Sequence, residues 1–135
     1  MVPHARITFH EIDLGPLPVE VINATLGLEL EPGNAVLTVG AQKHVHSRHP
    51  KDFAVHLAHV GMVIKAPSYM GDDFKNSGKI ELIRRVPGPT GLLVALVIEP
   101  DEDGRYHVAS FYTVTQSRID QRRQKGKVLN TRRKP

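Results

Sequence analysis

The run from Leu92 to Ile98 is apolar at every position, and it constrains the fold more than any other part of the sequence. It is far too short to cross a membrane, which takes about 20 apolar residues in a helix. A short run of this kind is typical of a strand that is buried on both faces. Strand-like segments flank it at 79–86 and 105–115, and the short separators suit antiparallel hairpins. The second half of the chain therefore predicts an antiparallel sheet.

The first half of the chain predicts helices. Apolar residues recur at helical spacing over 18–28 and over 50–65, where a proline suits the first turn because it has no backbone N–H. Between these helices, 35–39 predicts a short strand. Residues 1–16 and 68–78 are rich in turn residues and predict irregular structure.

A last helix and the order of the elements indicate the fold class. Ser117 is a suitable N-cap for a helix over 118–126, which Gly126 would end. Helices followed by a block of strands predict an α+β domain rather than a doubly wound parallel sheet. With 135 residues, of which 40% are hydrophobic, the chain can form one ordinary core. We expect one domain over 1–127 and a basic tail over 128–135.

Composition excludes several classes of protein. The chain has no cysteine, so disulfide scaffolds, thiolate metal sites and cysteine nucleophiles are excluded. The first residues lack the apolar core of a signal peptide, and the sequence predicts a cytoplasmic protein with no membrane partner. A toxin that is exported without an N-terminal signal would have the same features.

Basic residues are concentrated at the C-terminus. Residues 118–135 hold eight bases and one acid, whereas residues 1–117 hold ten bases and thirteen acids. A basic tail on a mildly acidic body indicates a polyanionic partner, most simply a nucleic acid. The alternative is a solvated C-terminus that only aids solubility.

Histidine is the over-represented residue, with eight copies, and three of them crowd together at His44, His46 and His49. Two imidazoles close to Arg48 favour a neutral form in at least one of them, which could then act as a base near neutral pH. This pattern supports general acid–base chemistry on a phosphodiester. Its spacing also fits a metal site, although no carboxylate lies close in sequence except Asp52. A third interpretation is a set of exposed histidines at a helix end.

Other polar side chains are candidates for holding a phosphate. Lys75 and Lys79 lie in a loop-to-strand passage that lacks the glycine spacing of a P-loop. Ser110 and Tyr112 share one face of the third strand, and Thr113 lies on the other. Because Tyr112 and Thr113 face opposite ways, they cannot both hold the same phosphate.

Four segments follow one another in a familiar order: HSRHP (46–50), APSY (66–69), KIELI (79–83) and YHVASFYTV (106–114). Over about residues 20–129, they resemble the phage-associated nuclease domains of the barnase–EndoU–colicin–RelE-like (BECR) superfamily. The resemblance implies N-terminal helices packed on a four-stranded antiparallel sheet, with a C-terminal basic helix. It also implies a metal-independent endoribonuclease, in which the ribose 2′-OH attacks the adjacent phosphorus and leaves a 2′,3′-cyclic phosphate.

The resemblance suggests roles for particular residues. His46 and His49 would be the acid–base pair, Lys79 or Arg84 would stabilise the phosphorane, and hydroxyls of the third strand would position the phosphate. The expected catalytic residues are His46, His49, Lys79, Arg84, Ser110, Tyr112 and Thr113. The expected nucleic-acid-binding residues are Arg48, Lys75, Arg118, Arg122, Arg123, Lys125 and Lys127.

The expected partner is single-stranded or transfer RNA, with no cofactor and no metal, and an inhibitor protein is a further candidate partner of such a toxin-like enzyme. Two other functions stay open on the sequence. One is a non-catalytic nucleic-acid-binding protein that is anchored by the basic tail. The other is a metal-dependent hydrolase that uses His44, His46 and His49 as ligands.

Overall fold

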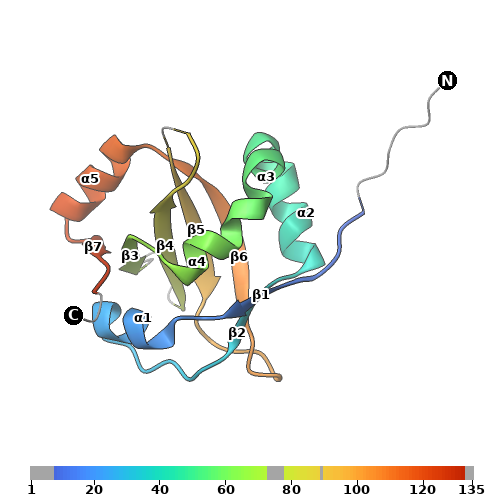
Figure 1. Cartoon of the computed structure of the whole chain (residues 1–135), viewed down its shortest axis with the longest axis horizontal. Helices are drawn as coiled ribbons and strands as arrows, with labels where there is room; N and C mark the ends of the chain where they lie inside the picture. The colour runs from blue at the N-terminus through green and yellow to red at the C-terminus, as the bar shows by residue number, and fades with distance from the viewer. Residues whose placement is uncertain (1–7, 73–77, 89, 133–135) are drawn as a thin grey trace.

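Seven strands form one mixed sheet in the computed structural model, which describes residues 8–72, 78–88 and 90–132 (Figure 1). The spatial order is β1-β2-β6-β5-β4-β3-β7, in which β2 and β6 are the parallel pair. The strands are β1 (Ile12–Pro16), β2 (Asn34–Leu37), β3 (Tyr69–Asp72), β4 (Lys79–Arg85), β5 (Gly91–Val97), β6 (Tyr106–Val114) and β7 (Val128–Asn130). The helices are α1 (Val19–Leu26), α2 (Val39–Arg48), α3 (Pro50–His56), the 3-10 helix η1 (Leu57–His59), α4 (Val60–Lys65) and α5 (Gln116–Gln124).

The α+β class is confirmed, but the expected four-stranded sheet is wrong. The three strand-like runs of the second half are β4, β5 and β6, and they pair antiparallel as expected. The additional strands lie where irregular structure was predicted: β1 in 1–16, β3 in 68–78, and β7 in the segment expected to be a tail. These strands have three to five residues and lie at or beside a sheet edge, so long-range pairing stabilises them more than their own sequence pattern does.

The predicted helix over 50–65 is interrupted in the structure. Its chain leaves the α-helix at His56, which has φ −113° and ψ 0°, and continues as η1 and then α4. The last helix begins earlier than expected, because the Thr115 hydroxyl caps it by accepting a hydrogen bond from the N–H of Arg118. Ser117 is therefore inside α5 rather than its N-cap.

The sheet separates two apolar layers. Helices α1 to α4 cover one face, where Phe53 of α3 stacks on Phe111 of β6. Helix α5 covers part of the other face, which we call the α5 face, through Ile119 packed on Ile83 and Val114 (Figure 1). The pairing of β5 with β6 is irregular just after Ala95. The irregularity changes the alternation of side chains along β6, so that two residues facing the helices are three positions apart there instead of two. The part of the α5 face around Ala95 carries polar side chains from its neighbouring strands, namely Glu81 and Ser110.

Within these described ranges, the helices are all too short or too polar to span a lipid bilayer.

The pairing of β3 with β7 can be tested at Gly71. A Cβ atom added there would lie 2.6 Å from the carbonyl oxygen of Lys127, at the start of β7. We expect Gly71→Ala to lower the free energy of unfolding by about 1–3 kcal/mol, as overpacking does elsewhere, measured by urea denaturation. Gly40→Ala is the matched control, because a Cβ in α2 meets nothing within 4 Å. Equal stability of the two variants would contradict the β3–β7 pairing.

Candidate active site

His49 lies at the corner between α2 and α3, where the local sequence makes the chain turn. A residue before proline disfavours the α-helical conformation, and His49 has φ −138° and ψ 62°. Its N–H closes α2 by donating to the carbonyl of Val45 at 2.7 Å, while Pro50 begins α3. The imidazole therefore projects from a corner rather than from the side of a helix.

The imidazole of His49 stacks on the phenol ring of Tyr112 in β6. The ring centroids lie 5.2 Å apart with an interplanar angle of 27°. Stacking covers one face of the imidazole and leaves the two nitrogens at its edge able to accept or donate a proton. Tyr112 also packs beside the cluster around Ile119, which places the pair at the α5 face.

Ser110 lies two residues before Tyr112 on the α5 face, and Glu81 lies farther across the same face. Ser110 is opposite Ala95, and Ala95 is opposite Glu81 across the adjacent strand, so the three form one row. Adjacent strands are about 4.8 Å apart, so the row spans about 10 Å from Ser110 to Glu81. The side chain of Ala95, in the middle of the row, is smaller than the polar side chains at its two ends.

Glu81 holds a cation from α5 over the sheet. Its side chain is 6% exposed and forms an ion pair with Arg122, whose side chain is one-quarter exposed. A buried carboxylate needs such a partner, and the pair fixes the guanidinium in place. The neighbouring Arg123 lies over the ring of Tyr69 at 5.3 Å. Two guanidinium groups of α5 are thus anchored on the sheet.

Several predicted site residues lie elsewhere. His46 packs edge-on against Phe9 and Phe53, with centroid distances of 5.7 and 5.3 Å, rather than beside Tyr112. The hydroxyl of Thr113 is bonded to Asp52 and does not share the face of Tyr112. These two residues therefore do not join the polar row.

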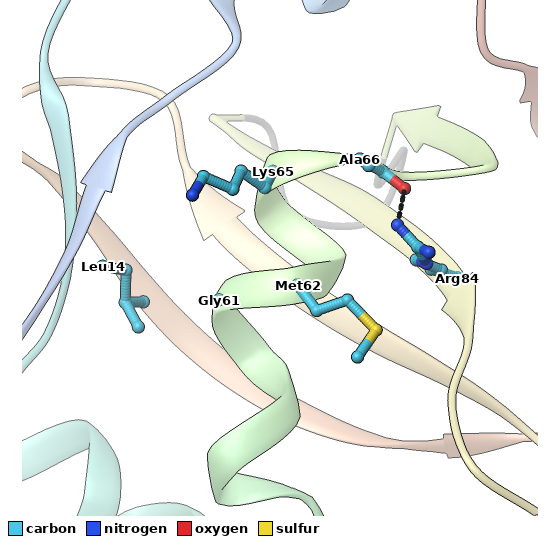
Figure 2. A pocket seen from close by; sticks show the side chains of 6 residues that line it. All are labelled: Leu14, Gly61, Met62, Lys65, Ala66 and Arg84. Carbon is cyan, nitrogen blue, oxygen red and sulfur yellow. Dashed lines mark hydrogen bonds between the residues drawn. The ribbon is translucent and has the colours of Figure 1, made fainter.

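Arg84 lies on the opposite side of the sheet from this row. It donates a hydrogen bond to the carbonyl of Ala66 at the end of α4, at 3.3 Å, and lines an open pocket there with Met62 and Lys65 (Figure 2). Lys79 is two residues before Glu81 in β4 and shares its face, half-buried opposite Val97. Of the two predicted phosphorane stabilisers, only Lys79 lies on the α5 face.

The predicted nucleic-acid-binding residues lie at the end of α2 and along α5. Arg48 is exposed in the last turn of α2, one residue before His49. Arg118 is exposed in the first turn of α5, and Lys125 and Lys127 are exposed where α5 ends. Lys75 lies outside the described residues.

The three clustered histidines do not form a metal site. In residues 8–72, 78–88 and 90–132, no three His, Cys, Asp or Glu side chains are arranged to hold a metal ion. His44 is exposed on α2, His46 lies among phenylalanines, and His49 stacks on Tyr112. The expected ligand spacing assumed one continuous helix or strand, and the turn at His49 breaks it.

Sequence reasoning missed two ionisable side chains of the sheet. Glu81 is the single charged residue in the otherwise apolar run 80–83, and a charge at such a position was the signal that could have identified it. The other group is His107, whose Nε2 lies 2.7 Å from Oδ2 of Asp101 in the β5–β6 hairpin. No periodicity in the sequence marks that pair, because the bend of the hairpin brings the two residues together.

Comparison with known proteins places this geometry in a family. The family model for phage-Barnase-EndoU-ColicinE5/D-RelE like nuclease3 matches residues 14–121. The chain belongs to this nuclease family. No curated protein and no solved structure matches the chain.

The match to this nuclease family covers most of the candidate site. It begins in β1 and ends within α5, so His49, Glu81, Ser110 and Tyr112 all lie inside the matched segment. Arg122 follows it by one residue. The expectation of a phage-associated BECR nuclease domain is therefore confirmed.

The carboxylate of Asp101 gives a test of the β5–β6 hairpin. Its hydrogen bond with His107, followed by the N–H of Arg105, holds the pKa of Asp101 well below its usual range. A depressed folded pKa stabilises the fold above the unfolded pKa of about 3.9, and the effect is lost as pH falls through the folded pKa. We expect Asp101→Asn to lower the Tm at pH 7, with a difference from the unmodified protein that shrinks below about pH 4.

Asp103→Asn is the control for that measurement, because Asp103 is in the same hairpin but its carboxylate is 80% exposed. Its Tm should follow that of the unmodified protein at every pH. If the difference in Tm between Asp101→Asn and the unmodified protein stays constant from neutral to acid pH, the charge of Asp101 is not what stabilises the hairpin.

Proposed function

We propose that this nuclease is a metal-independent endoribonuclease that cleaves RNA by transesterification at the α5 face. The ribose 2′-oxygen forms a bond to the adjacent phosphorus, and the bond from phosphorus to the 5′-oxygen breaks. The 2′-OH proton goes to a base and the 5′-oxygen leaves with a proton, so the products are a 2′,3′-cyclic phosphate and a 5′-hydroxyl. The observation that carries the proposal is the imidazole of His49 stacked on Tyr112, at the sheet face on which Glu81 anchors Arg122.

The roles follow from what each group can do. His49 takes the 2′-OH proton through a ring nitrogen at the edge of the stack. The hydroxyl of Tyr112 is our assigned donor to the leaving 5′-oxygen, and Ser110 donates to a non-bridging oxygen. Arg122, held by Glu81, stabilises the charge that grows on the phosphorane. Lys79 adds a second positive charge near the phosphorane from the same face.

Charge favours one end of the α5 face for RNA. Arg118 is exposed in the first turn of α5, just after β6 ends, and Lys125 and Lys127 are exposed where α5 leads into β7. The β5–β6 hairpin at the start of β6 instead exposes acids, among them Glu102 and Asp103. Phosphates are attracted to the first region and repelled by the second. The scissile phosphate therefore belongs near Tyr112 rather than near His107.

Proton transfer by His49 is tested with a DNA oligonucleotide that carries a single ribonucleotide, in the presence of chelator. We expect cleavage only after that ribonucleotide, with a cyclic phosphate end, and His49→Ala should lower the rate by about 100-fold or more. His44→Ala is the matched control on α2 and should cleave normally. Cleavage of an all-DNA oligonucleotide, or activity that depends on added metal, would contradict the mechanism. Binding without any cleavage would favour a non-catalytic RNA-binding protein.

Phosphate binding by Arg122 is tested by removing both charges of its ion pair. Glu81→Gln/Arg122→Gln keeps the net charge and leaves no orphaned buried carboxylate. On a 2′-O-methyl RNA, which cannot react, we expect weaker binding and a salt slope of log affinity that is smaller by about 0.7. Arg84→Gln, on the opposite face, should keep the slope of the unmodified protein. An unchanged slope in the double variant would remove Arg122 from the binding site.

A further inference from the structure

The edge of β6 that faces α2 and α3 has a strand partner only at its beginning. Strand β2 pairs with Tyr106 and His107, and in the described residues no strand covers that edge beyond them. Backbone groups on such an edge need other partners. At Thr113 the partner is a side chain, because the N–H of Thr113 donates to Oδ2 of Asp52 at 3.1 Å.

The same carboxylate also receives the hydroxyl of Thr113. Oγ1 of Thr113 lies 3.2 Å from Oδ1 and 3.3 Å from Oδ2 of Asp52. A carboxylate that accepts hydrogen bonds from two donors of one residue is held both in position and in orientation. Both residues are half-buried, so water competes less for these bonds than at an open surface.

The positions of these two residues in the chain link them to the catalytic pair. Asp52 is in the first turn of α3, three residues after His49, and Thr113 directly follows Tyr112. The bonds from Asp52 to Thr113 and the stack of His49 on Tyr112 therefore join the same corner to the same end of β6.

We propose that Asp52 is a positioning residue, whose bonds to Thr113 hold the imidazole of His49 against Tyr112 for proton transfer. This rests on the proposed function only for its effect on catalysis. On the α3 side, the carbonyl of His49 accepts the first backbone hydrogen bond of the helix, from the N–H of Phe53 at 2.8 Å, but no side chain caps the helix start. The direction of the corner therefore also depends on what anchors the first turn of α3. Deeper in α3, Phe53 stacks on Phe111 and anchors the rest of the helix independently. Loss of Asp52 therefore frees the corner while the helix stays packed.

The test measures the position of the ring separately from the activity. The proton signals of the His49 imidazole are shifted by the ring current of Tyr112, and Tyr112→Leu gives their unstacked values. We expect Asp52→Ala to move these signals toward the unstacked values, to lower kcat on RNA by about 10- to 100-fold, and to leave KM within about twofold. Asp52→Asn, whose amide oxygen can still accept from the N–H of Thr113, should keep most of the ring-current shift of the His49 signals and most of kcat.

A second variant covers the case in which Asp52→Ala does not fold. Thr113→Val keeps the backbone N–H and removes the hydroxyl, so it should move the His49 signals in the same direction by a smaller amount. Signals of His49 that stay at their original positions in Asp52→Ala and Thr113→Val overturn the proposal. If the unmodified protein cleaves no RNA, the proposed function fails, and the ring signals alone decide whether Asp52 positions His49.

Discussion

The short pairing of β2 with β6 determines where the corner at His49 can lie. Because β2 covers only the first two residues of β6, the remaining edge is left for α2 and α3 to approach. A longer β2 would satisfy those backbone groups itself and would keep the helices on their own side of the sheet. Tyr112 could not then be reached from the helical layer. The edge that β2 leaves uncovered is what allows a residue between two helices to stack on a residue of the opposite face.

The central strands were predictable from the sequence, and the edge strands were not. Leu92 to Ile98 is apolar at every position because β5 lies between two layers, and its turns are short enough to define both hairpins. Strands β1, β3 and β7 contain glycine, proline or too few residues to show a period of two. Their hydrogen bonds go to residues that are distant in sequence, and periodicity carries no information about such partners. The interruption at His56 was hidden for a similar reason, since the apolar pattern continues through it.

The candidate site shows the same division between local and distant information. Alternation along β6 predicted that Tyr112 and Thr113 face opposite ways, which the structure bears out with Tyr112 on His49 and Thr113 on Asp52. The pairing of His46 with His49 came from the family resemblance rather than from a local pattern. In the structure, His46 packs against Phe53, and the turn before Pro50 directs His49 to Tyr112. Glu81 and Arg122 are forty-one residues apart. Only the packing of α5 on the sheet brings them together, so no local pattern could have paired them.

The pair of Glu81 and Arg122 links the stability of the fold to its charge. An unpaired carboxylate at the buried position of Glu81 would be strongly destabilising, by about 3–5 kcal/mol, so α5 is held on the sheet partly by its arginine. The same guanidinium lies at the surface where we place the phosphate, and it still has N–H groups beyond the one that meets Glu81. The ion pair makes this part of the basic C-terminal region a structural part of the fold, and the proposed function gives the same guanidinium a second role at the phosphate. Under that proposal, the exposed lysines after α5 contribute only long-range attraction for RNA.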